Sequence, residues 1–124
     1  MELKKCINYG EINVQDMSCS VAGILVCEDE KNAEMFCCAN YGDITSNCSI
    51  SGLIDSGNTW NGELIVNNSY NVGNLSGRRE ICGICYAGTI KNCYNLGNLT
   101  GIGQVDGRTH YCSYYFERNP NKLS

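Results

Sequence analysis

The stretch that decides the fold is Cys93-Tyr94-Asn95-Leu96-Gly97-Asn98-Leu99. Its pattern is Cys or Ser, any residue, Asn, any residue, Gly, an acidic or amide residue, and Ile or Leu. The pattern occurs three more times without gaps, at Cys6–Ile12, Cys38–Ile44 and Ser69–Leu75. Four copies in 124 residues indicate a repeat protein, so periodicity is the first guide to its architecture.

A second landmark sets the length of the repeat. A glycine follows the Asn of each copy by twelve residues, or by fifteen in the first copy: Gly23, Gly52, Gly83 and Gly107. Successive Asn residues lie 32, 31 and 24 positions apart, so the longer copies carry inserted loops, at 27–34 and 55–63. We expect a single domain, 1–124, with copies at about 3–34, 35–65, 66–89 and 90–109 and an aromatic C-terminal cap at 110–124.

Each copy is too short to bury its apolar positions alone, which favours stacking of copies on one another. Apolar and polar residues alternate with period two, the signal of a β-strand, and glycine marks the turns. Stacked strands about 4.8 Å apart can bond to the copies above and below. The predicted fold is therefore all-β: a right-handed parallel β-helix, or β-solenoid, of about four coils.

Stacking places equivalent residues in columns, and each column has a physical interpretation. Asn8, Asn40, Asn71 and Asn95 are predicted to form a ladder of side-chain amides. Gly10, Gly42, Gly73 and Gly97 are expected to supply positive φ at a corner between strands. The Cys or Ser that begins each copy is expected to fit a tight interior, because it is small.

The segment 90–101 resembles the GLUG repeat of bacterial surface proteins and of certain IgA-cleaving peptidases. Segment 82–89 is similar to the glycine-rich strand that precedes that repeat, and 110–116 resembles the aromatic segment that closes such arrays. The resemblance implies a β-solenoid from secreted, multi-domain bacterial proteins. It also implies that the repeats act as a stalk or binding surface rather than as a catalyst.

Composition narrows the partners and the compartment. The formal net charge of -4 disfavours direct nucleic-acid binding, and no apolar run is long enough for membrane insertion. No signal-peptide pattern follows Met1, which predicts a cytoplasmic location for a complete chain and a secreted or surface location for a fragment. The ten cysteines have the abundance of a disulfide scaffold, but without a sign of an oxidising compartment the reduced state is the preferred expectation and disulfides are the alternative.

Catalytic and metal chemistry find little support in the pattern, so neither an enzyme nor a cofactor is expected. Cys82 and Cys85 form a CxxC, but a redox pair needs a helix start and this segment is predicted to be a strand. A structural zinc site from these two with Cys93 or Cys112 remains an alternative. His110, the one histidine, has no evident nucleophile to serve.

We expect the function to be binding of a protein partner through a flat face and inserted loops, with a glycan as a further partner. One variant is inhibition of a nucleic-acid-binding enzyme; the alternative function is an adhesive or spacer repeat. Open strand edges also predict weak end-to-end self-association at the N-terminal end. The candidate binding residues are Trp60, Asn58, Asn61, Arg78, Arg79, Glu11 and Asp43.

An aromatic column presents two interpretations. Tyr9 and Tyr41 occupy the position after the ladder Asn, which Val72 and Leu96 continue. The column predicts an aromatic stripe on one face, and ring stacking between adjacent coils explains it as well.

Overall fold

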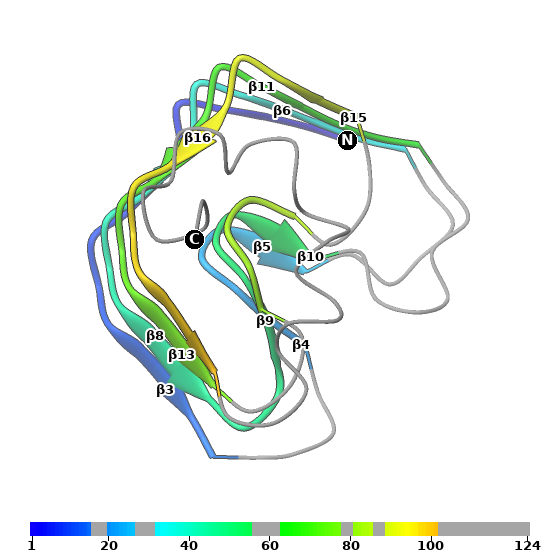
Figure 1. Cartoon of the computed structure of the whole chain (residues 1–124). Coiled ribbons are helices and arrows are strands. Elements are labelled where there is room, and N and C mark those ends of the chain that lie inside the picture. Colours follow the sequence, from blue (N-terminus) through cyan, green and yellow to red (C-terminus); the bar gives the residue numbers. More distant parts are fainter. Residues whose placement is uncertain (16–19, 27–31, 56–62, 78–80, 86–88, 102–124) are drawn as a thin grey trace.

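The computed structural model describes residues 1–15, 20–26, 32–55, 63–77, 81–85 and 89–101. These residues form β-strands and short connections, and no helix lies among them. Every pairing between the strands is parallel and joins one copy of the repeat to the next (Figure 1). The predicted all-β class and the parallel stacking are thus confirmed, and the arrangement is that of a β-solenoid.

Three four-stranded sheets form the outside of the stack. The first contains β1 (Glu2–Lys4), β6 (Ala33–Phe36), β11 (Leu64–Asn67) and β15 (Thr89–Lys91). The second contains β2 (Ile7–Asn8), β7 (Ala39–Asn40), β12 (Tyr70–Asn71) and β16 (Tyr94–Asn95). The third contains β3 (Ile12–Val14), β8 (Ile44–Ser46), β13 (Leu75–Gly77) and β17 (Leu99–Gly101).

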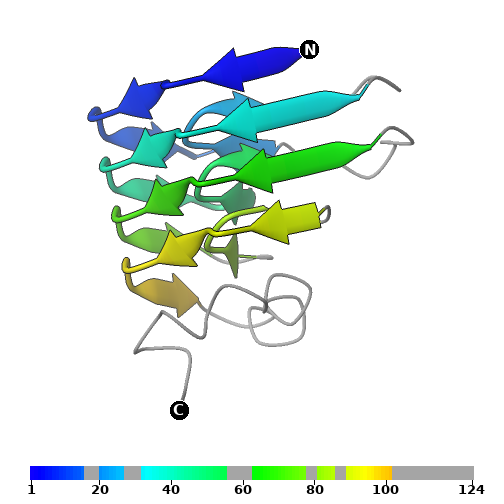
Figure 2. The same cartoon turned by 90° about the horizontal axis from the view of Figure 1, so that it is seen from above.

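Two smaller sheets complete each turn of the chain. One contains β4 (Ser20–Ala22), β9 (Ser49–Ser51) and β14 (Ile81–Cys82), and the other pairs β5 (Leu25–Val26) with β10 (Ile54–Asp55). Viewed along the stack, the larger sheets follow an open arc, and β5 and β10 curl back inside it (Figure 1). Figure 2, seen from above, shows the rows of strands one below another along the stack, from the N-terminal row at the top.

The second sheet holds the amide ladder. Its register pairs Asn8 with Asn40, Asn40 with Asn71 and Asn71 with Asn95. The Nδ2 of each Asn donates to the Oδ1 of the next, at 2.8, 2.8 and 2.6 Å. Each Nδ2 also donates to the carbonyl of the glycine two residues ahead, at 2.8–3.0 Å. The predicted column of stacked amides is therefore present, with both amide protons used in its central members.

The corner glycines have a different role from the one predicted. None of Gly10, Gly42, Gly73 and Gly97 has a left-handed φ. The left-handed residues lie five positions earlier in each copy: Lys5 (φ 57°), Cys37 (56°), Asn68 (49°) and Asn92 (53°). Asn tolerates this region better than most residues, and the isolated left-handed residue lets the chain turn between the first and second sheets. The expectation of positive φ at the glycines was wrong.

Close approach of neighbouring backbones is what demands glycine at that column. A Cβ on Gly73 would lie 1.9 Å from the carbonyl oxygen of Gly42, and a Cβ on Gly42 would lie 1.9 Å from that of Gly10. Gly10 is the end of the column, and a Cβ there would meet only the Oδ1 of Asn8, at 3.6 Å. Glycine is therefore required wherever a copy stacks on the copy before it.

Because glycine is required at stacked positions of the column but not at its end, the same substitution should have different effects at the two places. We expect Gly73→Ala to lower the free energy of unfolding by at least about 3 kcal/mol, because the backbones must separate to admit the methyl group. Gly10→Ala, in the same column, should change it by less than about 0.5 kcal/mol. Urea denaturation followed by circular dichroism measures both. Similar losses at the two positions would contradict the stacking explanation.

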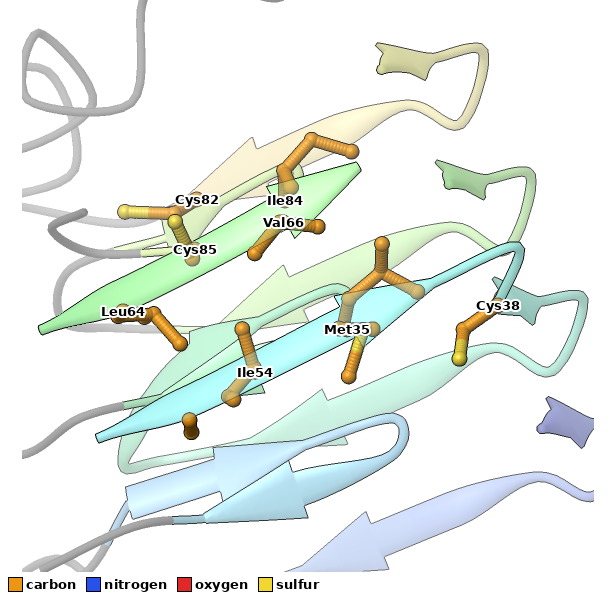
Figure 3. Packing of buried hydrophobic residues seen from close by; sticks show 10 residues of the cluster. Met35, Cys38, Ile54, Leu64, Val66, Cys82, Ile84 and Cys85 are labelled. Atoms are coloured by element: carbon orange, nitrogen blue, oxygen red, sulfur yellow. The ribbon is translucent and has the colours of Figure 1, made fainter. Parts of the chain in front are cut away.

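Apolar side chains pack in two clusters inside the stack. The larger lies between the first sheet and the inward strands, and includes Met35, Val66, Ile54 and Ile84, all with no exposed surface (Figure 3). The smaller lies between the third sheet and the β4–β9–β14 sheet, around Ile44, Ile50, Leu75 and Ile81.

The amide ladder packs against the second glycine landmark. A Cβ on Gly52 would lie 2.9 Å from Cγ of Asn71, and one on Gly83 would lie 2.8 Å from the same atom of Asn95. The glycine twelve residues after each Asn therefore leaves room for the amide of the next copy. Because Asn71 and Asn95 are almost fully buried, any loss in the ladder cannot be repaired by water.

Removal of one central amide should be costly. Asn71→Ala deprives the Nδ2 of Asn40 of one acceptor and the carbonyl of Gly73 of one donor, both inside the stack. We expect a loss of about 2–4 kcal/mol in the free energy of unfolding, measured by urea denaturation. Asn8→Ala, at the partly exposed end of the ladder, is the matched control and should cost less than about 1 kcal/mol. Equal losses in the free energy of unfolding for the two variants would show that burial does not determine how much an amide of the ladder contributes.

Some expected features fall outside the described residues. They include the aromatic cap at 110–124, most of the inserted loops at 27–34 and 55–63, and Gly107, the last of the second landmark glycines.

Candidate functional site

The outer surface of the second sheet forms an uncharged aromatic and apolar strip, here named the tyrosine face. Because the ladder Asn points inward, the residues on either side of it point outward. One column before the Asn contains Ile7, Ala39, Tyr70 and Tyr94, and the column after it contains Tyr9, Tyr41, Val72 and Leu96. Four of the eight are tyrosines and none is charged.

The four tyrosine rings contact one another along the stack. Tyr9 stacks on Tyr41 with ring centroids 5.2 Å apart and an interplanar angle of 12°. Tyr41 meets Tyr70 edge to face at 5.8 Å, and Tyr70 stacks on Tyr94 at 5.0 Å and 3°. These are favourable geometries for aromatic pairs, so the tyrosine face holds a continuous run of four rings.

The run of rings crosses from one column to the other at Ala39. Tyr9 and Tyr41 belong to the column after the Asn, whereas Tyr70 and Tyr94 belong to the column before it. Ala39 occupies the earlier column beside Tyr41 and is itself buried. Its small side chain leaves space for the crossing, which the hydroxyls of Tyr41 and Tyr70 complete with a hydrogen bond of 2.5 Å.

The hydrogen bond between the two hydroxyls also changes the acidity of Tyr41. It is the main reason that the pKa of the Tyr41 phenol is raised above its ordinary value. The phenol therefore stays neutral through the physiological range. A neutral hydroxyl beside an exposed ring can bind both polar and apolar groups of a partner.

Four of the eight residues of the tyrosine face are exposed, although its rings stack. The exposed fraction is 73% for Tyr9, 39% for Tyr41, 49% for Ile7 and 51% for Leu96. Stacking between coils and exposure to solvent therefore occur together, and the two interpretations of the aromatic column are compatible. Exposed apolar residues that form one contiguous patch are typical of an interaction surface.

The outer surfaces of the two neighbouring sheets differ in character. On the first sheet, Glu2 and Glu34 are exposed in register, and the ammonium group of Lys4 lies 5.9 Å from the ring centroid of the half-buried Phe36. On the third sheet, the outward positions are small and polar: Asn13, Thr45, Ser76 and Thr100. Among the described residues, Phe36 is a single ring on the first sheet, whereas the tyrosine face is the surface on which several aromatic rings contact one another.

The predicted binding residues divide into two groups. Trp60, Asn58, Asn61, Arg78 and Arg79 lie outside the described residues. Glu11 and Asp43 are exposed in one column beside the glycine corner.

The acidic column has a structural use. Oδ1 of Asp43 accepts the backbone N–H of Asn74 at 2.9 Å, and Oδ1 of Asn74 accepts that of Asn98 at 3.0 Å. The structure does not bring Asp43 together with a cluster of acidic side chains, because the next copies carry amides in the same column.

Sequence reasoning identified half of the run of rings. Tyr9 and Tyr41 share one column of the repeat pattern, whereas Tyr70 and Tyr94 lie outside that column. A signal was present: these two tyrosines occupy the other outward column of the same short strand. Recognising that both columns flank the inward Asn would have joined the four rings.

The Cys or Ser column satisfies backbone groups at the left-handed corner. The hydroxyl of Ser69 donates to the carbonyl of Asn67 at 2.8 Å and accepts the N–H of Cys38 at 3.1 Å. The thiols of Cys38 and Cys93 donate in the same way to the carbonyls two residues earlier, at 3.4 and 3.2 Å. Small size alone does not explain the column; a hydrogen-bond donor is also required.

Burial makes these thiols poor nucleophiles. Desolvation is the main cause that raises the pKa of the thiols of Cys38, Cys85 and Cys93. A thiolate is the reactive form of cysteine, so a raised pKa suppresses reaction at neutral pH.

Cys48 and Cys82 each take part in a disulfide bond, so the expectation that all ten cysteines are reduced was wrong. Cys6, Cys37, Cys38, Cys85 and Cys93 are thiols. Among the described residues, no group of three or more His, Cys, Asp or Glu side chains lies together as a metal site requires.

Alkylation rates should distinguish the exposed thiol, the buried thiols and the disulfide-bonded cysteines from one another. We expect iodoacetamide at pH 8 to label Cys37, which is exposed, in the native protein, while Cys38 and Cys93 react slowly because their pKa values are raised. Cys48 and Cys82 should stay unlabelled in denaturant until a reductant is added. Peptide mass spectrometry reads out each site. Labelling of Cys38 as fast as Cys37 would contradict the burial argument.

The fold and this surface define a class: a β-solenoid with an exposed aromatic strip. No family model, no curated protein and no solved structure matches the chain. No helix in the described part of the chain has the length and apolar character to cross a membrane.

Proposed function

We propose that this protein is a non-enzymatic β-solenoid that binds a protein partner through the tyrosine face. The observation that carries the proposal is the run of four tyrosine rings on an uncharged sheet surface, of which Tyr9 and Tyr41 are exposed and Tyr70 and Tyr94 are half-buried. Tyrosine is enriched at protein interfaces, where its ring buries much area and its hydroxyl fixes orientation. Rings held by their neighbours lose little conformational freedom on binding.

The geometry favours a protein over a glycan as the principal partner. The tyrosine face combines rings with aliphatic side chains such as Ile7 and Leu96, which suit apolar side chains of another protein. Bidentate polar groups beside the rings would favour a sugar; the exposed carboxylates of Glu11 and Asp43 lie two residues beyond Tyr9 and Tyr41, but Oδ1 of Asp43 already accepts a backbone N–H. The inserted loops that contain Trp60 and Arg78 are proposed as a second contact region.

We also propose the finer architecture expected from the repeat: a right-handed helix of about four coils, closed by an aromatic cap at 110–124. The four-stranded sheets support the coil number, because each contributes one strand per copy. Inhibition of a nucleic-acid-binding enzyme remains a variant of the function; it draws on the exposed Glu11 and Asp43.

One observation favours a second candidate, an adhesive or spacer repeat of a secreted bacterial surface protein of the GLUG type. Cys48 and Cys82 are disulfide-bonded, and disulfides are typical of secreted proteins. The structural-zinc alternative is weaker, since Cys82 would first have to be reduced to supply a thiolate.

Binding can be tested with matched variants. Chemical crosslinking in a lysate of the native host would identify a partner. The purified partner is then titrated with this protein in a calorimeter to measure the affinity. We expect Tyr41→Ser with Tyr70→Ser to weaken binding by roughly 30-fold or more, as loss of an aromatic anchor does. The control, Thr45→Ala with Ser76→Ala on the third sheet, should leave affinity within about twofold.

A third variant separates the face from the loops. Trp60→Ala with Arg78→Ala reports on the loop side alone. If the tyrosine variant is folded and still binds as tightly as the wild type, the tyrosine face is not the contact surface. Loss confined to the loop variant would transfer the site to the loops.

A further inference from the structure

At the N-terminal end of the stack, β1 is the edge strand of the first sheet among the described residues (Figure 2). Leu3 and Ile12 point toward the core but remain partly exposed, whereas their register partners Met35 and Ile44 have no exposed surface. Such an end favours association.

The open edge of β1 presents backbone groups in a regular pattern. The carbonyl of Met1 accepts the N–H of Glu34, and the N–H of Lys5 donates to the carbonyl of Phe36, both at 3.0 Å. Odd-numbered positions of this strand therefore face β6. Because backbone groups alternate in direction along a strand, those of Glu2 and Lys4 face the open edge.

The charges on this edge are symmetric about Leu3. Glu2 and Lys4 flank it on the outer surface, where both are exposed and form an ion pair at 3.5 Å within the strand. An antiparallel copy of β1 centred on Leu3 would place each Glu2 opposite the Lys4 of its partner. It would also place the two Leu3 side chains about 4.5 Å apart at their Cα atoms, on the core side.

We propose that the N-terminal end is an interface for a second copy of this chain, joined by antiparallel pairing of the two β1 strands about Leu3. The two-fold arrangement supplies hydrogen bonds from Glu2 and Lys4 of both copies and two cross-strand ion pairs. It also covers the exposed end of the larger apolar cluster, to which Leu3 belongs. A two-fold interface of this kind closes on itself and does not propagate into a fibre.

Charge explains why the occupant is a second copy. An arbitrary peptide strand would meet one acidic and one basic residue and would gain only by chance, whereas a second copy matches both. The chain carries a net charge of -4, which opposes association, so the dimer should be weak. A contact this small predicts a dissociation constant on the order of 100 µM.

The experiment is a charge exchange measured by sedimentation velocity on the full 124-residue chain over about 10 µM to 1 mM. The wild type should dimerise. Glu2→Lys alone and Lys4→Glu alone should each weaken the dimer at least about tenfold, because like charges then face each other. The double variant, Glu2→Lys with Lys4→Glu, should restore it.

Mixing the two single variants is the decisive arm. Each fails to pair with itself, but together they present opposite charges at every facing position, so a heterodimer should form. Circular dichroism confirms that each variant is folded, and both altered residues lie outside the tyrosine face. A monomeric wild type, single variants that dimerise like the wild type, or a mixture of folded variants that stays monomeric would each overturn the proposal.

Discussion

The whole structure depends on how closely neighbouring copies approach at the second sheet. There, the backbone of one copy lies so near the next that no Cβ fits between Gly42 and Gly73. The same spacing lets each buried Asn donate one amide proton to its own corner and the other to the next copy. Bare glycine backbone and inward amides are two parts of one constraint, because the amide reaches its neighbour only when the backbones are this close. In any other register the buried amides would lack hydrogen-bond partners, and the cost of leaving them unsatisfied would destabilise that register.

The surface chemistry follows from that constraint. An inward Asn on a two-residue strand forces the residues before and after it to face outward. In this chain those positions are occupied largely by tyrosine and aliphatic residues, so the ladder that fixes register also creates the tyrosine face. The rings stack because the copies are in register, and they stay exposed because the adjacent sheets bend away at the corners (Figure 1). The interaction surface is thus built by the same spacing as the core.

The cysteines show how far composition can mislead. Their number suggested one common state, but position in the repeat separates them. Those that begin a copy donate hydrogen bonds at the left-handed corner, as Ser69 does with its hydroxyl, and burial raises the pKa of the thiols of Cys38 and Cys93. Cys48 and Cys82 lie in other columns and are disulfide-bonded. The repeat pattern distinguished these groups by column, but bond formation depends on distances that a pattern does not contain.

The sequence by itself determined the repeat, the strand class, the parallel stacking and the column of amides. Each of these follows from local periodicity and from residues that recur at fixed offsets. The tertiary structure decided which residue takes the left-handed corner, why glycine is needed beside it, and how Tyr70 joins Tyr41. Only Asn68 and Asn92 of the four left-handed residues share a side-chain type, and Lys5 and Cys37 differ from them, so no common pattern marked the corners. The crossing of the rings at Ala39 depends on space left by a small neighbour in an adjacent coil, and such space exists only once the coils are stacked.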